Sequence, residues 1–469
     1  MHNRRRPFLY NRLQHGQRYP QLDHHHATNL DSSARHHHDH RYKIPIRLGW
    51  CCSYRSALAF GAGASGVANY GAWCGSFFSG DVARMRRSQD SIFVMAKQIK
   101  VGVVGCGYWG PNLIRNFRSL PDCNLKMMCD VSEHRLAHLK SLYPEVEGET
   151  DYHHMLNGVG LDAVIIATSV RSHFPMAKAS LLAGKHTFIE KPMAASSGEC
   201  EELIDIARKQ GSVLMVGHTF LYSPAVSKIK EIVQRGDIGE IRYICARRLN
   251  LGLFQKDINV AWDLAPHDIA IILHILEQEA VSINCKGSAH ITPGVEDVTT
   301  MWLNFPGDRS AIIHNSWLDP RKVREMTIVG SKQMIVYDDV SPLEKIRVYD
   351  TRVERPPHYD TFAEFQYSYH YGDVHVPHIR QEEPLKMECQ HFLDCINQGT
   401  TPLTGGKQGL ELIRILEASS ESLKLGGASV SVSERNNGNR CIPPLVQSTP
   451  MPNQSRAQKV SPDSGCVLV

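Results

Sequence analysis

The chain has 469 residues, of which 42% are hydrophobic, a length that accommodates two or three domains with a large core. Its formal net charge of +4 is uneven, because residues 1–94 carry 13 Lys and Arg against 5 Asp and Glu, which leaves the remainder at −4. The net charge of the main body therefore gives no reason to expect nucleic-acid binding. The 13 cysteines are scattered without C-x-x-C pairs, which excludes a zinc ribbon and favours free thiols in a reducing compartment, the cytoplasm.

Residues 1–94 differ in composition from the rest of the chain. They contain an Arg-rich start and two histidine tracts but few periodic apolar positions, which predicts a low-complexity, disordered extension. Two alternatives remain open: an organellar presequence, and a natural start at Met95. Residues 56–80 are uncharged but rich in glycine, so no membrane span is expected there.

A strand-like run at 99–104 leads into a glycine motif. Gly105, Gly107 and Gly110 are spaced G-x-G-x-x-G, and Asp130 follows the next apolar run twenty residues later. This combination is the dinucleotide-binding fingerprint, in which the middle glycine lets a pyrophosphate approach the backbone at a helix N-terminus. Asp130 would accept hydrogen bonds from the adenosine ribose. No Arg follows it immediately, so the sequence predicts NAD in preference to NADP.

Strands and helices alternate from residue 97 to 218. Strand-like runs lie at 99–104, 124–129, 162–167, 186–190 and 213–217, and helical runs between them include 173–183 and 197–210. Alternation of this kind predicts a doubly wound parallel sheet, an α/β Rossmann domain that binds its ligand beyond the carboxyl ends of the strands. Thr168 and the pair Glu190–Lys191 follow two of these ends.

A second domain is predicted over 219–432, of α+β class with a large, mostly antiparallel sheet. Its strands are expected at 240–250, 281–291, 297–305, 309–317, 321–329 and 332–338, and its helices at 224–235, 266–277, 384–398 and 407–424. Three histidines, His370, His375 and His378, are loosely spaced on a predicted loop, and we expect no metal there. The tail at 433–469 is rich in Asn, Ser and Pro and predicts disorder.

From about Lys97 to Val432 the sequence resembles the Gfo/Idh/MocA family of NAD(P)-dependent oxidoreductases. The resemblance rests on GCGYWG at 105–110, AT at 167–168 with His173 following, AGKHTFIEKP at 183–192 and WDLAPHD at 262–268. Three further stretches, at 217–226, 247–252 and 316–339, look most like the nucleotide-sugar branch, which includes UDP-N-acetylglucosamine 3-dehydrogenases.

The resemblance implies an NAD-dependent oxidation of a sugar or nucleotide-sugar hydroxyl, at C3. Such a reaction needs a base for the hydroxyl proton and a cation for the developing alkoxide. The family's lysine and its D-x-x-x-H pair map onto Lys191, Asp263 and His267. We assign His267 as base, Lys191 as cation and Asp263, one helical turn earlier, as the group that orients the imidazole; the reverse assignment of Lys191 and His267 also fits.

The remaining site predictions concern binding. Residues expected to contact the cofactor are Gly105, Gly107, Tyr108, Trp109, Gly110, Asp130, Thr168, His173, Glu190 and Lys191. Tyr222, Arg248 and Asn250 are candidates for the sugar or its phosphates, and are equally compatible with core or sheet-surface positions. The broad sheet of the second domain has a face that needs cover, so we expect a homo-oligomer, a dimer or a tetramer.

Two other functions fit the same residues. An NAD-dependent glycoside hydrolase of this fold also begins by oxidising C3, and a non-catalytic NAD-binding regulator would share the fingerprint. Fold analogy alone does not separate them. The presence of Lys191, Asp263 and His267 favours an enzyme over a regulator.

Removal of the extension before Met95 should leave the protein intact, because that segment has too few apolar positions to add to a core. A chain starting at Met95 is expected to retain the melting temperature, measured by differential scanning fluorimetry, and the NAD affinity of the full chain. Loss of soluble expression on truncation would contradict this.

Overall fold

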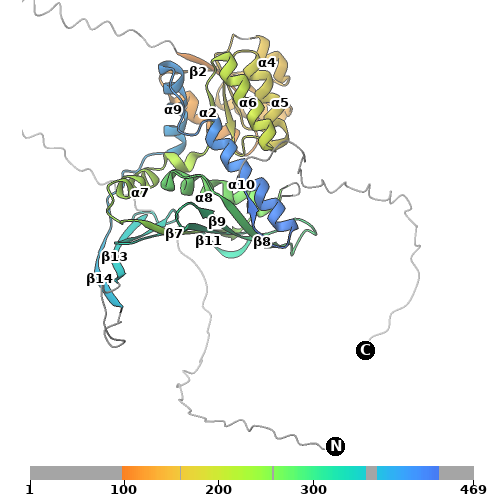
Figure 1. Ribbon diagram of the computed structural model, residues 1–469. Helices are drawn as coiled ribbons and strands as arrows, with labels where there is room; N and C mark the ends of the chain where they lie inside the picture. Colours follow the sequence, from red (N-terminus) through yellow and green to blue (C-terminus); the bar gives the residue numbers. More distant parts are fainter. Residues whose placement is uncertain (1–97, 159, 256–257, 355–366, 433–469) are drawn as a thin grey trace, which may run out of the picture. The chain divides into compact units, whose positions relative to one another are not determined.

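The computed structural model describes residues 98–158, 160–255, 258–354 and 367–432. The chain divides into two compact units, 1–91 and 92–469, and every described residue belongs to the second. The predictions made for residues 1–94 and for the tail at 433–469 therefore lie outside the described residues. Within the second unit the α/β class and both predicted sheets are confirmed (Figure 1).

The first sheet has six parallel strands in the order β3-β2-β1-β4-β5-β6, as expected for a doubly wound Rossmann domain. The strands are β1 (Ile99–Val104), β2 (Cys123–Cys129), β3 (Glu147–Glu149), β4 (Ala163–Ile166), β5 (His186–Glu190) and β6 (Leu214–Gly217). The helices between them are α2 (Gly110–Ser119), α3 (Glu133–Leu142), α4 (Tyr152–Gly158), α5 (Val170–Leu182) and α6 (Ser197–Gln210).

Local sequence signals explain why these elements begin and end where they do. The four residues of β4 are all fully buried, as in a parallel strand covered on both faces. Helix α6 starts after Ser196, whose side chain accepts a hydrogen bond from the backbone N–H of Glu199, and stops at Gly211 in the left-handed conformation with φ of 62°. These cap signals are why the sequence predicts its range of 197–210.

The second sheet has nine strands in the order β14-β13-β12-β11-β7-β10-β9-β8-β15, and only β7 and β10 pair in parallel. Its strands are β7 (Ile241–Leu251), β8 (Ser282–Ser288), β9 (Val298–Phe305), β10 (Arg309–Ser316), β11 (Leu318–Gly330), β12 (Met334–Asp338), β13 (Ile346–Glu354), β14 (Ser368–His375) and β15 (Val430–Ser431). The remaining elements are the 3₁₀ turn η1 (Thr219–Tyr222), α7 (Pro224–Gln234), α8 (Val260–Leu276), α9 (Pro384–Gln398) and α10 (Gly406–Lys424).

Two predictions in this domain are wrong. The helix expected to start at Pro266 begins at Val260 instead, because Asn259 caps it and the extra turn buries Val260, Ala261 and Trp262. The stretch around His370 and His375 is strand β14 rather than a loop, and His370 Nε2 lies 2.8 Å from the Asp350 carboxylate of β13.

One face of the nine-stranded sheet carries helices α7, α8 and α10, which lie on the side that faces the Rossmann domain (Figure 1). On the other face, five cross-strand neighbours form a largely apolar row, none of them fully buried: Trp302, Ile312, Cys245, Thr327 and Val336. Trp302 is 46% exposed. Among the described residues no helix is both long and apolar enough to span a bilayer.

Candidate active site

The glycine turn after β1 is shaped by its neighbours. Gly105 has φ of 95°, and a Cβ there would lie 2.5 Å from the carbonyl oxygen of Ala167; a Cβ on Gly110 would lie 1.9 Å from that of Gly105. Gly107 is different, because the only atom near its hypothetical Cβ is Arg135 Nη1 at 3.8 Å. The turn is therefore close-packed on its inner side and open at Gly107. An open backbone at the start of α2 fits the pyrophosphate of a dinucleotide.

Asp130 directly follows β2 and is buried beside this turn. Its carboxylate accepts hydrogen bonds from the backbone N–H groups of Cys106 at 2.7 Å and Ser132 at 2.9 Å. A carboxylate can accept about four hydrogen bonds, so it retains capacity for ribose hydroxyls. The sequence did not reveal Arg135, one turn into α3, whose Nη1 lies 3.6 Å from the Asp130 carboxylate. An acid and a cation thus meet at the adenosine end of the site.

Two aromatic residues follow Gly107, and they differ in environment. Tyr108 is 90% exposed, whereas the indole N–H of Trp109 donates to Glu190 Oε1 at 2.7 Å. This bond connects the glycine turn to the end of β5, where Lys191 follows. Burial raises the pKa of the Glu190 carboxyl to about 7, against the opposing effects of Lys191 and Trp109.

His173 does not face the cofactor with a free nitrogen. It is buried, and its ring nitrogens lie 2.8 Å from the carbonyl oxygen of Pro192 and 3.1 Å from that of Thr168. The imidazole therefore bridges the loops that follow β4 and β5. Thr168 Oγ1 lies 3.8 Å from the Met176 sulfur, next to this bridge. His173 thus holds those two loops together, and its contact with the cofactor stays a prediction.

Lys191 and Asp263 meet across the two domains. The Lys191 ammonium donates to the backbone carbonyl of Asp263 at 2.9 Å and lies 3.6 Å from its carboxylate. The other carboxylate oxygen accepts from the indole N–H of Trp317 at 3.1 Å. Asp263 thus orients Lys191, where the sequence led us to expect that it would orient His267.

Trp317 owes its position to Gly252. A Cβ on this glycine would lie 2.5 Å from the Trp317 ring, and the Gly252 N–H donates to the Trp317 carbonyl at 3.0 Å. Trp317 is fully buried against Phe254 and Leu264. A chain of contacts therefore runs from Gly252 through Trp317 to Asp263 and Lys191.

His267 lies one turn after Asp263 on α8, half-buried. Its ring centroid is 4.8 Å from that of Phe220, and its Nδ1 is buried without a hydrogen-bond partner. Burial, followed by the positive charges of Lys191 and Arg248, lowers the pKa of this imidazole well below its usual range. A neutral imidazole beside an ammonium group is the pairing that proton abstraction needs.

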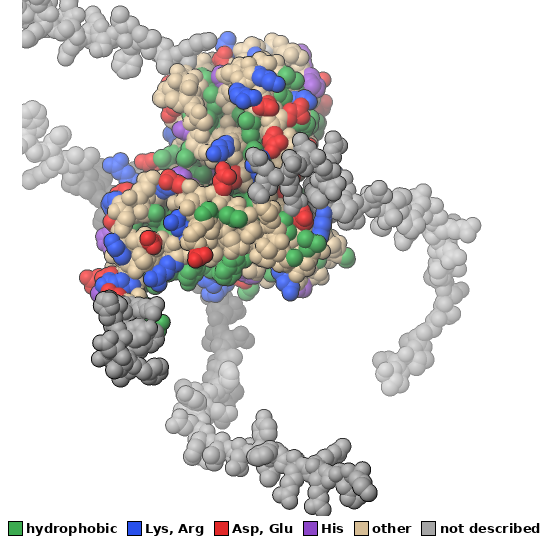
Figure 2. Space-filling view, viewed as in Figure 1, with side chains coloured by type: hydrophobic (Ala, Val, Ile, Leu, Met, Phe, Trp, Pro, Cys, Tyr) green, Lys and Arg blue, Asp and Glu red, His purple; other side chains and the backbone are tan. Residues whose placement is uncertain are grey.

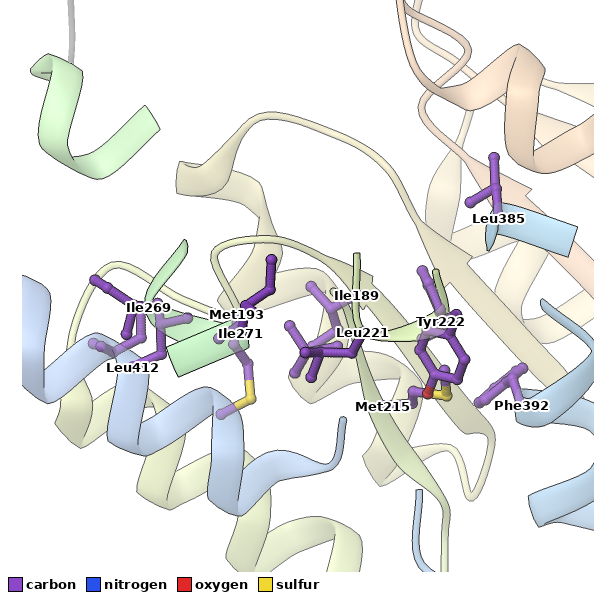
Figure 3. Packing of buried hydrophobic residues seen from close by; sticks show 14 of the residues in the cluster. Ile189, Met193, Met215, Leu221, Tyr222, Ile269, Ile271, Leu385, Phe392 and Leu412 are labelled. Atoms are coloured by element: carbon purple, nitrogen blue, oxygen red, sulfur yellow. The ribbon is translucent and has the colours of Figure 1, made fainter. Parts of the chain in front are cut away.

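The substrate candidates divide into core and cleft residues. Tyr222 is buried beside Met215 and Phe392 (Figure 3), with its hydroxyl 3.2 Å from Thr404, so it belongs to the core. Arg248 is also buried, and its guanidinium makes two hydrogen bonds to the Asp268 carboxylate, at 2.9 and 2.8 Å. Asn250, two residues further along β7, is half-buried.

Several residues of this region carried too weak a signal in the sequence. The centroid of the Phe220 ring lies 4.6 Å from the Arg248 guanidinium carbon and 5.7 Å from that of Arg324, so the ring that packs on His267 also contacts two cations. Phe220 and its neighbour His218 belong to the stretch 217–226 that carried the resemblance, which was the available hint. On the face shown in Figure 2, acidic and basic side chains are interspersed.

A Rossmann sheet with this glycine turn, joined to an α+β domain that supplies Asp263 and His267, defines an NAD-binding oxidoreductase. The NAD-binding Rossmann model of the Gfo/Idh/MocA oxidoreductases matches residues 99–218, and the C-terminal domain model of the same family matches 226–336. The chain belongs to the Gfo/Idh/MocA family. This confirms the predicted family, the cofactor NAD and the enzyme class, a dehydrogenase acting on CH–OH groups.

Individual relatives are distant. The uncharacterized oxidoreductase YrbE of Bacillus subtilis is 27% identical over 71% of this chain and 96% of its own length, and the myo-inositol 2-dehydrogenase of Thermotoga maritima is 24% identical over 70% and 96%. Among solved structures, the UDP-N-acetylglucosamine 3-dehydrogenase of Acidithiobacillus ferrooxidans superposes with a TM-score of 0.60 at 21% identity, covering 70% of this chain and 99% of that one. This likeness shows the shared fold.

NAD should bind in preference to NADP, because Asp130 repels a 2′-phosphate. We expect NADP to bind at least about tenfold more weakly by fluorescence titration. Asp130→Ala should narrow the difference between the NAD and NADP affinities, because it removes the acid and leaves Arg135 free to bind the 2′-phosphate. Glu133→Ala, which removes an exposed acid from the first turn of α3, should not change the ratio. Equal affinities in the wild type would contradict the prediction.

Gly107→Val should abolish NAD binding without unfolding the protein. The space around Gly107 is open, so the new side chain costs the fold little but occupies the place of the pyrophosphate. Gly198→Val, at a helical glycine with equally open surroundings, is the matched control and should bind NAD normally. Calorimetric NAD titration and the melting temperature report the two effects. Normal NAD binding by Gly107→Val would place the pyrophosphate elsewhere.

Proposed function

We propose that this protein oxidises a secondary hydroxyl, at C3, of a sugar or nucleotide sugar. The observation that carries the proposal is the Lys191–Asp263 pair beside the unpartnered imidazole of His267, at the edge of the sheet where the cofactor turn lies. A cation and a neutral base side by side are what removal of a hydroxyl proton requires.

His267 acts as the base and takes the hydroxyl proton. Its surroundings favour the neutral form, because a buried imidazole near Lys191 and Arg248 is costly to protonate. Lys191 donates a hydrogen bond to the same oxygen and stabilises the negative charge that develops there. Asp263 holds the ammonium in place. NAD⁺, when bound, accepts the hydride that leaves the carbinol carbon.

The substrate class rests on similarity and on charge. One relative is named for oxidation of myo-inositol and a structural neighbour for oxidation of UDP-N-acetylglucosamine, so cyclic polyhydroxy compounds are the common feature. Arg324 adds a further cation at the Phe220 ring, with its guanidinium 3.5 Å from Asp339. A guanidinium group at this position would suit a substrate that carries phosphate groups.

A panel of UDP-sugars, inositols and aryl glycosides, incubated with the protein and NAD, tests this function. NADH absorbance with a sugar or nucleotide sugar is the expected result, and the position of the new carbonyl is read by NMR. Release of the aglycone without net NADH would instead identify a glycoside hydrolase. NAD binding without any turnover would identify a regulator.

Lys191→Ala and His267→Ala should each lose at least about 100-fold in the chemical step while retaining NAD affinity. Asp263→Asn should lose less, because it only positions Lys191. Lys178→Ala is the control, a surface lysine paired with Glu202, and should turn over normally. Single-turnover absorbance measures the step. Full activity of His267→Ala at neutral pH would transfer the role of base to Lys191.

The pH profile gives a second readout of the same assignment. His267 must be neutral to accept the proton, and its pKa is lowered well below 6.5, so wild-type kcat/KM should stay high below pH 6.5 before it falls. Lys191→Met removes a positive charge and should move the fall towards higher pH. If the fall of kcat/KM at low pH is unchanged in this variant, His267 is not the group that titrates.

The outer face of the nine-stranded sheet should bind a second copy of the chain. The row from Trp302 to Val336 exposes apolar surface on a wide sheet, which is typical of an interface. Light scattering at micromolar concentration is expected to give a dimer or tetramer. Trp302→Glu should dissociate it, whereas Leu142→Glu, at an equally exposed position on α3, should not. A monomeric wild type would contradict the proposal.

A further inference from the structure

A pocket of about 380 Å³ lies between η1, α8 and α10. Its mouth is at the surface, where Glu277, Glu279 and Lys407 are exposed, and its inner end is formed by Ala270 and His218, which are 7% and 3% exposed. At about 30 Å³ for each water molecule, it has room for roughly a dozen waters. The pocket thus runs from solvent to a buried imidazole.

Unsatisfied polar atoms converge on this pocket. Both ring nitrogens of His218 are buried without a hydrogen-bond partner, and so are Oε1 of Gln278 and Oε1 of Glu411, which line the same pocket. Buried polar groups without partners are costly, and ordered water is the usual way to satisfy them. Burial and the nearby Glu279 raise the pKa of the Glu411 carboxyl to about 7, so this group can exchange protons near neutrality.

The inner end of the pocket adjoins the proposed catalytic groups. His218 directly precedes η1, whose Phe220 ring packs on His267. Ala270 and Leu273, which line the pocket, lie one and two turns after His267 on α8. The charge of Lys191 acts on His218, and His218 in turn acts on His267. His218 therefore lies between the catalytic cleft and the water-accessible pocket.

We propose that His218 relays the proton released by substrate oxidation from the cleft to water in this pocket. The relay rests on the proposed function. Oxidation of the alcohol sends the hydride to NAD⁺ and leaves one proton on His267, whose Nδ1 is buried and without a hydrogen-bond partner. One nitrogen of His218 accepts this proton, and the other nitrogen gives its own proton to water in the pocket. That water passes the proton on to Glu411 or to bulk solvent.

A neutral imidazole suits this task. It has one donor and one acceptor nitrogen, so a proton can enter on one side and leave from the other. Burial, with a smaller effect from Lys191, lowers the pKa of His218 to about 4, so the ring is neutral at rest and passes the proton on. The charge of Lys191 acts on His218, and His218 acts on His267, whereas Glu411 and Gln278 line the pocket together with His218.

His218→Ala tests the relay on the substrate that the panel identifies. Turnover should fall at least about tenfold. The solvent deuterium isotope effect on kcat should rise, and the isotope effect of a deuterated carbinol carbon should shrink, because proton release now limits the rate. Imidazole in the buffer should restore turnover by entering the pocket. NAD affinity and melting temperature should stay close to those of the wild type.

His186→Ala is the control, because it removes an imidazole away from the pocket. His186 is half-buried at the start of β5, where it accepts a hydrogen bond from the Val213 N–H at 3.0 Å. Its turnover and isotope effects should not change. The relay is overturned if His218→Ala turns over normally. It is also overturned if the loss comes without imidazole rescue and without a change in the solvent isotope effect, since a structural role alone would give that result.

A crystal structure of the full chain with NAD gives a test that needs no substrate. Ordered waters should connect His218 to Gln278 and Glu411 and continue to the pocket mouth. A dry pocket, or one filled by a bound organic molecule, would overturn the relay even in an active enzyme. A wild type that binds NAD but oxidises nothing would refute the proposed function, whatever the pocket contains.

Discussion

The ammonium group of Lys191 is the point at which the two domains of the described chain share one site. The lysine comes from the loop after β5, and both of its oxygen partners belong to Asp263 in the first turns of α8. Neither domain contains this pair alone. The cleft geometry therefore depends on how the Rossmann sheet packs against the helices of the second sheet, and any shift between them changes the position of the cation that faces the substrate.

Most of the charged side chains around His267 are paired with a group of opposite charge. Arg248 is paired with Asp268 in a buried ion pair, and Arg324 lies near Asp339. Both guanidinium groups lie over the Phe220 ring, which also packs on His267. Burying such a pair is costly unless its hydrogen bonds are satisfied, as they are between Arg248 and Asp268. The result is a base that stays neutral beside an ammonium group.

The sequence predicts those parts of the fold that depend on local signals. The glycine turn, the strand at 186–190 and the helix at 197–210 depend on near neighbours in the chain, and their observed bounds agree. The start of α8 was misjudged because a proline usually opens a helix, whereas here burial of the preceding turn outweighs the hydrogen bond that Pro266 cannot make. Strands β13 and β14 were missed because they pair mainly with each other.

The site was harder to predict, because its key contacts join distant positions. Trp109 reaches Glu190 across 81 residues, and Trp317 reaches Asp263 across 54. The spacing of four residues on a helix predicts that Asp263 orients His267. Spacing alone cannot reveal that Lys191 and Trp317 bind the same carboxylate. For Arg248 the sequence left a substrate contact and a core position equally open, because it could not show the buried partner Asp268.

Gly252 influences the active site indirectly, although it is not among the residues predicted to contact substrate. Even one methyl group there would collide with the Trp317 ring that supports Asp263. An alanine at this position would be expected to resemble a defect in the catalytic lysine, with cofactor binding preserved and turnover reduced. Selection for a fast reaction would therefore limit substitution of this glycine, although its position is simply that of a residue at a strand end.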